Sequence, residues 1–538
     1  MANLLFEITS FLFSVFLISN AFFWLKLWED KEYNWKRLFI HLTETKQGRK
    51  IVIGTESLIK WGIILLYGTT IYSSRFDIYY HFIVFSLYTY LFIKLIIKIY
   101  NKDFHLPTFS LQAASILGLS LFFEFTVYAF APLDRFLWLI LLDKLLAFII
   151  GIFILIFLVF FDFSKDIVVN KAAEKLRSFK NLLTIAVVGS YAKGTTKEFT
   201  TRVLSNKFNV LETKTSFNTD LGIAKTILSG LSPRKQIFIA EMEDGNFGDI
   251  GEMSRLLIPK IAVVTGINDQ KISIFGSLEK ILDSKFQVVN FLPKDGIALF
   301  NANNENSLNL YRKAKIKKFL YGTESPQNKN LDIKAFNIKE SRFSISFSVL
   351  VFGKKYKITG VKLLGKQNVE NLLPAIFIGL YLGIDFSTIR KVFQEFNPLP
   401  KSMEPRVTVK GVTLINDTYN ANINSVLRVL DYIKIYKGKK ILVLEPLIEL
   451  GKNAENDHIK LGQEIGKVCD FLFLTNDNYY KSIRSRIKNG VKACSIQFFP
   501  PLKIAEFIEK SCNKNDVVIF EGHESLASFL ALRSESPY

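Results

Sequence analysis

Cysteine is scarce in this chain of 538 residues, which has only Cys469, Cys494 and Cys512, all in its last quarter. Three cysteines exclude a disulfide scaffold and a four-cysteine zinc site, and their spacing fits no metal motif. We interpret them as reduced core thiols of a cytosolic domain. Fourteen prolines and 29 glycines exclude a collagen-like or low-complexity chain. A hydrophobic fraction of 49% excludes disorder.

Acidic residues are also in short supply. The chain carries 69 lysines and arginines against 49 aspartates and glutamates, a formal net charge of +20 at pH 7. A basic chain of this kind binds either nucleic acid or an anionic membrane surface. The sequence has no zinc-finger spacing, no RNA-binding sheet signature and no basic helix with base-reading residues, so we expect no nucleic-acid partner.

Long apolar stretches fill the first part of the chain. There are five before Ser164, at about Leu4–Leu25, Thr55–Ser74, Ile78–Ile97, Pro107–Ala131 and Phe136–Phe163. A spanning helix needs about 20 mostly apolar residues, and the second stretch meets this least securely. Five buried helices of a soluble domain are the alternative, but such helices show a polar face and these mostly do not. We therefore predict that residues 1–165 form an α-helical membrane bundle of about five spans, in contact with membrane lipid.

Basic residues are distributed unevenly over the loops between these stretches. The first loop is rich in them from Lys26 to Lys50, whereas the second and fourth hold only Arg75 and Arg135. The third loop and the segment Lys165–Lys180 are basic again. Because cytoplasmic loops are enriched in lysine and arginine, we expect a multi-pass protein of the cell membrane with its N-terminus outside. The remainder of the chain would then be cytoplasmic.

Three charged residues, Glu124, Asp143 and Lys144, fall inside the predicted spans. Charges within a membrane are costly and often functional. A structural Glu–Lys pair between the fourth and fifth spans is the equally weighted alternative.

The pattern changes to short β-branched runs alternating with helical stretches after a linker at residues 166–180. The first strands are expected at Leu183–Val188, Phe208–Leu211, Gln236–Ala240, Lys260–Thr265 and Gln287–Phe291. Strands that alternate with helices predict a mainly parallel sheet with helices on both faces. A polar meander near Lys334–Thr359 predicts added antiparallel strands, and helices follow near Gln367–Leu382 and Phe386–Phe396.

A phosphate-binding loop is indicated where the first of these strands ends. The strand runs into Gly189-Ser190-Tyr191-Ala192-Lys193-Gly194-Thr195-Thr196, and a helix begins there. Backbone N–H groups at a helix N-terminus hold phosphate, a lysine neutralises it, and a hydroxyl reaches Mg²⁺. The order of residues departs from the usual Gly-Lys-Thr. Taken alone, the motif is therefore as consistent with an ordinary turn between a strand and a helix as with a phosphate-binding loop.

The wider context resembles the Mur ligase family, in particular its branch that adds D-Ala-D-Ala to a muramoyl tripeptide. The resemblance rests on several motifs in the right order. They are the loop Gly189–Glu198, Asn218–Gly222, Glu241-Met242 with Asn246–Ile250, Phe275–Glu279 with Lys285, Asn301–Asn304, Gly365–Asn371, Asn416–Asn422, and Leu444–Gly451 with His458. It covers about residues 181–538 and implies a P-loop, parallel-sheet ATP-binding domain at 181–403 and a C-terminal Rossmann-like domain at 404–538.

The resemblance also implies a reaction and a set of roles. Members of the family phosphorylate a carboxylate with ATP and let an amine attack the acyl phosphate, with Mg²⁺ present. The implied catalytic residues are Lys193, Lys285, Asp417, Asn420 and His458. The implied ATP-binding residues are Gly189, Ser190, Lys193, Thr195, Thr196, Asn368, Asn371, Asp417 and Tyr419. The implied metal-binding residues are Thr195, Glu241 and Lys285, the last as the family's carbamylated lysine. The implied partners are a muramoyl-peptide precursor and a D-Ala-D-Ala-like amine.

Several positions depart from the family pattern. The loop glycine is Ala192, the usual Mg²⁺-binding threonine is Gly194, and the metal-binding histidine falls at Lys271. Membrane spans stand where soluble ligases carry a uridine-nucleotide domain, so we expect a precursor that is lipid-linked or delivered at the membrane. The leading hypothesis is a membrane-anchored ligase of peptidoglycan precursor synthesis. The rivals are a catalytically degenerate scaffold for other cell-wall enzymes, and a relative that forms another amide, such as a polyglutamate or pseudomurein bond.

Overall fold

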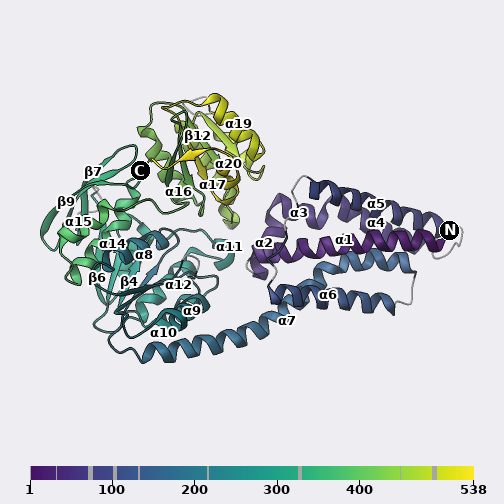
Figure 1. Ribbon diagram of the computed structural model, residues 1–538, viewed down its shortest axis with the longest axis horizontal. Coiled ribbons are helices and arrows are strands. Elements are labelled where there is room, and N and C mark those ends of the chain that lie inside the picture. Colours follow the sequence, from purple (N-terminus) through teal and green to yellow (C-terminus); the bar gives the residue numbers. More distant parts are fainter. Residues whose placement is uncertain are drawn as a thin grey trace. The chain divides into compact units, whose positions relative to one another are not determined.

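The computed structural model describes residues 2–31, 33–70, 77–100, 104, 106–108, 110–130, 134–214, 217–324, 330–448, 450–487 and 494–537. They belong to two compact units, Met1–Asp166 and Ile167–Tyr538 (Figure 1).

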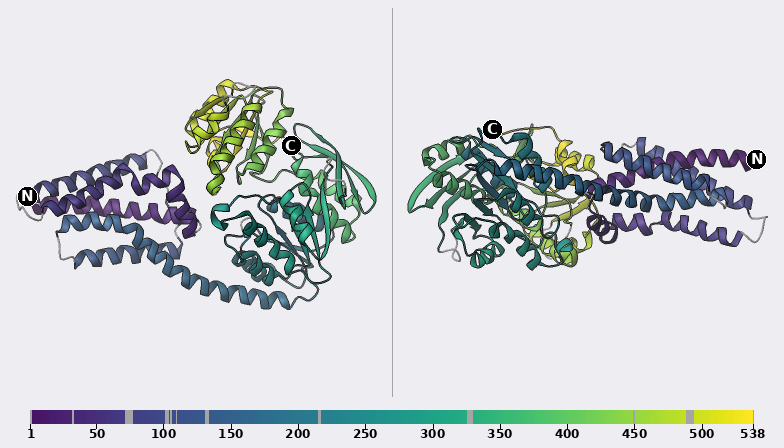
Figure 2. Two further views of the ribbon diagram at one scale, coloured as in Figure 1. Left: turned by 180° about the vertical axis from the view of Figure 1, so that it is seen from behind. Right: turned by 90° about the horizontal axis from the view of Figure 1, so that it is seen from below.

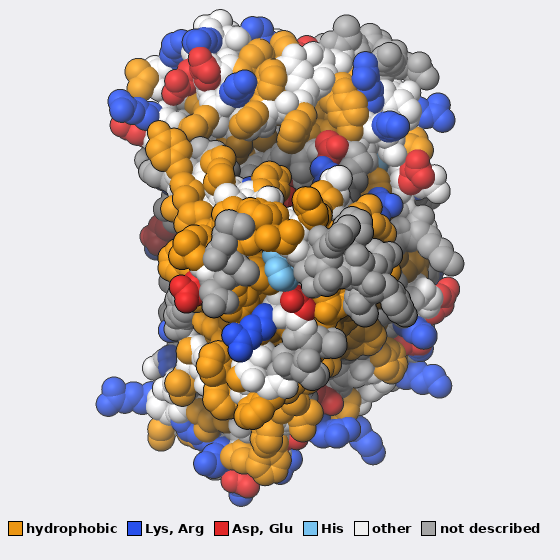
Figure 3. All heavy atoms as spheres, turned by 90° about the vertical axis from the view of Figure 1, so that its right-hand side faces the viewer, with side chains coloured by type: hydrophobic (Ala, Val, Ile, Leu, Met, Phe, Trp, Pro, Cys, Tyr) orange, Lys and Arg blue, Asp and Glu red, His pale blue; other side chains and the backbone are white. Residues whose placement is uncertain are grey.

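The first unit is made of helices. These are α1 (Ala2–Asp30), α2 (Trp35–Glu44), α3 (Lys46–Ile53), α4 (Thr55–Thr70), α5 (Asp77–Tyr100), α6 (Leu111–Ala129) and α7 (Arg135–Arg177). Large apolar side chains remain exposed along them, as expected for helices that face lipid. Hydrophobic side chains also cover much of the face drawn in Figure 3. The unit therefore has the character of a membrane-associated bundle.

The number of spans agrees with the prediction only in part. Within the described residues, four helical stretches are long and apolar enough to cross a membrane: Leu4–Asp30, Ile78–Tyr100, Leu111–Ala129 and Arg135–Arg177. The predicted second span forms α4, which is 16 residues long as described, and residues 71–76 lie outside the described part. Sixteen residues rise about 24 Å, less than the roughly 30 Å of a bilayer core. Five spans and the orientation that follows from them therefore stay predictions.

Polar residues meet inside the helical unit around Asp143 of α7. Lys60 of α4 forms an ion pair with Asp143. The amide of Asn20 and the hydroxyl of Tyr88 donate to the same carboxylate at 3.0 and 3.4 Å. Four helices thus converge on one buried charge.

The pairing expected between the fourth and fifth spans is absent from the described residues. Lys144 donates instead to the hydroxyl of Ser57 at 2.7 Å. Glu124 is 1% exposed, and neither of its carboxylate oxygens has a hydrogen-bond partner among the described residues.

The second unit begins with a nine-stranded sheet of order β2-β3-β1-β4-β5-β6-β7-β8-β9. Its strands are β1 (Leu183–Val188), β2 (Val210–Glu212), β3 (Ile237–Glu241), β4 (Ile261–Val264), β5 (Ile297–Asn301), β6 (Lys317–Thr323), β7 (Ile333–Glu340), β8 (Ile345–Val351) and β9 (Lys354–Val361). Pairing is parallel from β2 to β7 and antiparallel for β7–β8 and β8–β9. The predicted parallel sheet with an antiparallel meander is confirmed.

Helices cover both faces of this sheet (Figure 2). They are α8 (Lys193–Leu204), α9 (Asp220–Gly230), α10 (Asp249–Leu257), α11 (Ile272–Phe275), α12 (Leu278–Asn290), α13 (Glu305–Lys313), α14 (Gln367–Tyr381) and α15 (Phe386–Gln394). Side chains of β1 alternate between the faces: Ile185 and Val187 pack with α8 and α14, and Ala186 and Val188 pack with α9 and α10. This alternation puts a separate apolar core on each side of the sheet.

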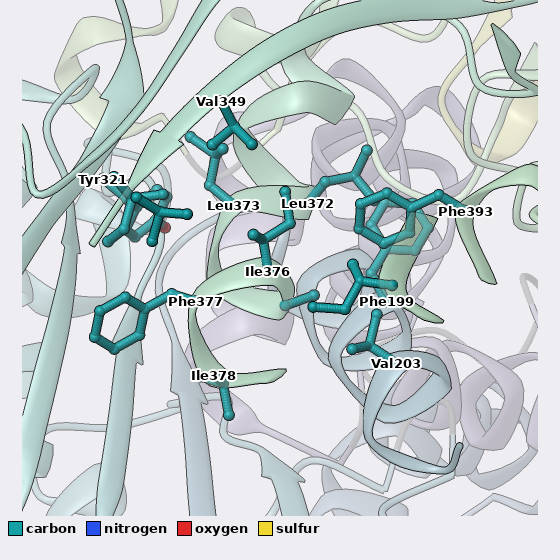
Figure 4. Close-up of a cluster of buried hydrophobic side chains, with 14 of the residues drawn as sticks. Phe199, Val203, Tyr321, Val349, Leu372, Leu373, Ile376, Phe377, Ile378 and Phe393 are labelled. Atoms are coloured by element: carbon teal, nitrogen blue, oxygen red, sulfur yellow. The ribbon is translucent and has the colours of Figure 1, made fainter. Parts of the chain in front are cut away.

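The core on the first face is built largely from α8 and α14 (Figure 4). Phe199 and Val203 of α8 meet Leu372 and Ile376 of α14, and all four are fully buried. Burial of each such aliphatic or aromatic side chain stabilises the fold by roughly 1.5–3 kcal/mol. The helix that follows the predicted phosphate loop is therefore held firmly.

The C-terminal part has a seven-stranded sheet of order β14-β13-β12-β15-β11-β10-β16. Its strands are β10 (Glu404–Thr408), β11 (Thr413–Asp417), β12 (Lys440–Leu444), β13 (Phe471–Leu474), β14 (Ser495–Phe498), β15 (Val517–Glu521) and β16 (Ser534–Glu535). Its helices are α16 (Ile423–Tyr432), α17 (Ala454–Val468), α18 (Tyr480–Ile487), α19 (Pro501–Ser511) and α20 (Leu526–Leu530), with short 3₁₀ turns at Ile433–Ile435, Gly451–Asn453 and His523–Ser525. The five strands from β14 to β11 are parallel, as predicted.

Two local expectations are corrected. The run Gln287–Phe291 is not a strand, because it continues the amphipathic helix α12, whose start is capped by Ser277 and whose buried side chains recur at helical spacing. The fifth strand lies further on, at Ile297–Asn301. The expected linker at 166–180 is helical as far as Arg177.

The structure describes all three cysteines, and none of them forms a disulfide. Cys469 and Cys512 are buried, and Cys494 is partly exposed.

Candidate functional site

The carboxyl end of β1 leads into the predicted phosphate loop. Gly189 has φ +151°, and an added Cβ would lie 2.0 Å from Oγ1 of Thr265, so only glycine fits there. The Thr265 hydroxyl donates to the carbonyl oxygen of Tyr191 at 2.6 Å and fixes the loop. Ala192 caps α8 with φ 64°, a left-handed conformation that costs a residue with a Cβ about 1–2 kcal/mol. The loop is thus a strained turn at the N-terminus of a buried helix.

Lys193 opens α8 and lies buried within this turn. Its Nζ is 2.5 Å from a carboxylate oxygen of Glu243. Burial opposes its charge, but the carboxylates of Glu243 and Glu241 outweigh burial and raise the pKa of Lys193. Thr195 and Thr196 follow in the first turn of α8, the former half-buried and the latter 1% exposed. The charged lysine and the helix N-terminus together make an environment suited to phosphate.

Glu241 ends β3, the strand next to β1, and faces the start of α8. A Cβ on Gly194 would lie 3.1 Å from its Oε2. The amide of Asn218 donates to its Oε1 at 3.3 Å. The absence of a side chain at Gly194 therefore leaves the Glu241 carboxylate close to the helix N-terminus, beside the phosphate loop.

A buried cluster of ion pairs adjoins the loop. Glu243 also forms an ion pair with Lys271, whose Nζ donates to the carbonyl oxygen of Asp244 at 2.9 Å. Lys285 of α12 is 2.5 Å from Oδ1 of Asp244, and the two side chains are 2% and 1% exposed. Ser284 donates to the other oxygen of Asp244 at 2.8 Å. Glu243, Asp244, Lys271 and Lys285 line a pocket of about 10 Å³, which is room for about one water molecule.

The pKa values in this cluster follow from burial and pairing. Burial raises the pKa of Asp244, but the ammonium groups of Lys285 and Lys271 outweigh it and hold that pKa below its ordinary value. Burial also works against ionisation of Glu243, and Lys193 and Lys271 overcome it, so its pKa lies well below normal. Burial lowers the pKa of Lys285, and Asp244 and Glu243 offset part of that shift. Both carboxylates are therefore ionised.

Asn368 and Asn371, the residues expected to contact the nucleobase, begin α14. Asn368 donates to the carbonyl oxygen of Leu364 at 2.8 Å, and Asn371 donates to Oδ1 of Asn368 at 3.3 Å. Both amides are thus buried in local hydrogen bonds.

The C-terminal sheet brings a second acidic pair together. Asp417 ends β11 and Glu521 ends the neighbouring strand β15, in register. Burial raises the pKa of Asp417 to about 7, and burial together with the neighbouring Asp417 raises the pKa of Glu521 well above its ordinary value. The Ser425 hydroxyl donates to Oε1 of Glu521 at 2.5 Å. One proton shared between the two carboxyls accounts for their closeness.

Other members of the Asn416–Asn422 run reach outward or toward the first sheet. Tyr419 is 52% exposed and Asn420 is exposed. Asn422 caps α16 and accepts from the amide of Asn268 at 3.5 Å. The run therefore touches the nine-stranded domain near the phosphate loop.

His458 is the predicted catalytic residue that the structure does not bring into the site. It is fully buried in α17, its Nε2 accepts from the backbone N–H of Leu447 at 3.0 Å, and its Nδ1 lies 2.6 Å from the carbonyl oxygen of Ala454. Its ring stacks on Tyr479 at 4.1 Å. Burial lowers the pKa of His458 to about 4. The histidine is a neutral core residue that ties a loop to its helix.

Several residues of the site were missed by sequence reasoning. Glu243 and Asp244 stand directly after the Glu241-Met242 motif, and two further acids at the end of an apolar strand were the available signal. Arg428 lies 4.9 Å over the ring of Tyr191 and pairs with Glu370 at 3.3 Å, which links α16 to the phosphate loop. No local pattern marks Arg428.

Two family models match parts of the chain that lie in the second unit. The family model of the Mur ligase middle domain matches residues 187–379, and that of the Mur ligase, glutamate ligase domain matches residues 403–523. Together the two models cover more than half of the chain.

Curated relatives carry the name UDP-N-acetylmuramoyl-tripeptide–D-alanyl-D-alanine ligase. The protein of Escherichia coli (strain K12) is 27% identical over 282 residues, which are 52% of this chain and 61% of the relative. That of Haemophilus influenzae is 28% identical over 368 residues, 67% of this chain and 78% of the relative. The crystal structure of MurF ligase from Thermotoga maritima in complex with ADP superposes with a TM-score of 0.61 at 22% identity, over 68% of this chain and 83% of that one. At this identity the structural match establishes the fold.

Proposed function

The chain belongs to the Mur ligase family of ATP-dependent amide ligases, and from this premise we propose that it is a membrane-anchored ligase of peptidoglycan precursor synthesis. It would join D-Ala-D-Ala or a similar amine to the carboxylate of a muramoyl peptide. The observation that carries the proposal is the placement of buried, charged Lys193 at the N-terminus of α8, with Glu241 facing the same turn.

The residues present fit ATP and one divalent cation. Loop residues Gly189 to Thr196 offer backbone N–H groups, and Lys193 offers the positive charge that a triphosphate needs. Glu241 offers a carboxylate beside the loop, and Thr195 a nearby hydroxyl. Mg²⁺ in such sites is held by one or two carboxylates together with substrate phosphates, which supports these two residues as its protein ligands.

The chemistry follows from these positions. ATP would phosphorylate the precursor carboxylate, and the amine would then displace phosphate from the acyl phosphate. Lys193 would stabilise negative charge that develops on the transferred phosphoryl group. Asp417, Tyr419 and Asn420 would meet the nucleotide and amine from the C-terminal domain, and closure would keep water from the labile intermediate. Asn368 and Asn371 would hold the nucleobase side.

The helical unit supports a reaction at the membrane surface. We propose a precursor that is lipid-linked or delivered at that surface, a cytoplasmic ligase domain and an external N-terminus, with domain limits at 165, 180 and 403. A chain with four spans instead of five would have both of its ends on the same side of the membrane. Protease protection of tags at either end, in sealed inverted vesicles, distinguishes these topologies.

The test of the activity is precursor-dependent phosphate release by the detergent-solubilised full chain. It would be supplied with Mg²⁺, ATP, D-Ala-D-Ala and either the UDP-linked or the lipid-linked muramoyl tripeptide. Lys193→Ala should abolish release, whereas Lys225→Ala, on the exposed face of α9, should leave it unchanged. ATP binding without turnover for either precursor would refute the ligase and leave the scaffold hypothesis. Product formation with another amine would redirect the proposal to a different amide.

A further inference from the structure

The buried ion-pair cluster next to the phosphate loop balances its own charge. Three ammonium groups, of Lys193, Lys271 and Lys285, meet three carboxylates, of Glu241, Glu243 and Asp244. Every one of these side chains except Lys271 and Glu243 is at most 7% exposed, and those two are 17% and 24% exposed. A cluster that is neutral without any added ion offers no net attraction to a further divalent cation, beyond the one that accompanies ATP.

Lys285 cannot take a carbamate without disrupting this arrangement. Its Nζ already lies 2.5 Å from Oδ1 of Asp244, and both groups are buried. A carbamate would replace a cation by an anion beside that carboxylate, which like-charge repulsion in a buried site strongly disfavours. It would also add three heavy atoms, whereas the adjoining pocket of about 10 Å³ admits about one water molecule.

Lys271 supplies a cation at a fixed place. Its backbone is left-handed, with φ 72°, directly before α11. Its side chain is tied to Glu243 and to the carbonyl oxygen of Asp244. An ammonium group has three donors and no lone pair, so it cannot be a metal ligand. Among the described residues there is also no group of three or more His, Cys, Asp or Glu side chains that could hold a metal ion. The residues present therefore do not fit a second metal.

We propose that Lys271 is a built-in cation of the catalytic site, positioned by Glu243 and Asp244, and that the site works with one divalent cation and an unmodified Lys285. The proposal rests on the proposed ligase function. In it, Lys271 neutralises charge on the phosphoryl group or the acyl oxygen, as a second cation beside Lys193. Glu243 forms ion pairs with both lysines, and Lys193 exchanges Glu243 for the nucleotide when ATP binds.

Two measurements on the full chain in detergent test this directly. First, ¹³C NMR after incubation with ¹³C-bicarbonate reports a carbamate on lysine. We expect no such resonance, and a resonance that disappears in Lys285→Arg would overturn the proposal. This measurement needs no nucleotide, so it decides the question even for a chain that fails to bind ATP. Second, Mn²⁺ titration followed by electron paramagnetic resonance, with a non-hydrolysable ATP analogue bound, counts metal ions. One Mn²⁺ per chain is expected, and two would overturn the proposal.

A variant that removes the charge of Lys271 should change the rate of phosphate release in a way that the loss of a merely structural lysine would not. Lys271→Met should lower precursor-dependent phosphate release by roughly 100-fold, the size of losing one preorganised electrostatic group. Binding of the ATP analogue should change little, and Lys271→Arg should restore part of the rate. Lys280→Met, an exposed lysine of α12, is the matched control. If Lys271→Met released phosphate at the unaltered rate, the proposal would be refuted. If the unaltered chain released no phosphate, the result would instead count against the ligase function itself.

Discussion

The buried carboxyl pair Asp417–Glu521 makes the stability of the C-terminal domain depend on pH. Burial raises the pKa of Asp417 to about 7, against about 3.8 for an aspartate in water. Between these values the folded state binds more protons than the unfolded state, so stability is lost as pH rises through the window. The difference of about three pH units, at about 1.36 kcal/mol each, corresponds to roughly 4 kcal/mol of folding stability, and this stability is fully lost above pH 7.

Replacing Asp417→Asn should remove this loss, because an asparagine has no proton to give up as the pH rises. The asparagine keeps the size of the side chain and can still accept from the backbone N–H of Met403. We expect the variant to equal the unaltered chain at about pH 4 and to exceed it in stability by up to about 4 kcal/mol near pH 8. Glu464→Gln, at an exposed position of α17, should show no such pH-dependent difference.

Native-state hydrogen exchange of peptides from β11 and β15 is the appropriate assay. All five tryptophans lie before residue 140, so intrinsic tryptophan fluorescence would report on the helical unit instead. A stability difference between variant and unaltered chain that stays constant across this pH range would refute the shared-proton reasoning. So would a variant that is less stable at every pH.

Three other substitutions test separate features. Ala192→Gly should relieve the left-handed strain at the start of α8 and stabilise the domain by about 1 kcal/mol in thermal unfolding, and a loss of stability would contradict this. His458→Ala should destabilise the C-terminal domain by roughly 2–4 kcal/mol, because packing is lost and a buried N–H is left unsatisfied. A tenfold loss of ATP affinity in the folded variant would show instead that the histidine belongs to the site. Lys60→Met should leave Asp143 buried without its ion-pair partner and destabilise the helical unit by roughly 3–5 kcal/mol, measured by unfolding in detergent. An equal effect from Lys98→Met, at the end of α5, would refute the pairing argument.

Much of the fold was predictable because it depends on local periodicity. The strands at Leu183–Val188 and Lys440–Leu444 were located to the residue, since each is a β-branched or apolar run that ends at a glycine or a charged residue. The same rule failed at Gln287–Phe291. There a short β-branched run ends an amphipathic helix, and local composition does not distinguish the two.

Part of the site was predictable for a related reason. Glu241 ends one strand and Lys193 lies five residues beyond the end of another, and the carboxyl ends of parallel strands meet at one edge of a sheet. His458 is found buried in the core, which its spacing in the motif could not indicate, because spacing says nothing about which way a ring points. Burial between a loop and α17 decides that, and it gives both ring nitrogens backbone partners.

The sequence by itself determined the order of the parts, the Mur ligase family and the position of the phosphate loop, because these depend on local pattern and motif order. Only the tertiary structure decided which charges meet. Glu243, Lys271 and Lys285 are separated by up to 42 residues, and Asp417 and Glu521 by 104. Their pairings arise where distant elements pack together, and burial there converts ordinary surface charges into a neutral cluster and a shared proton. No one-dimensional pattern encodes such contacts, since they depend on how the strands and helices are stacked.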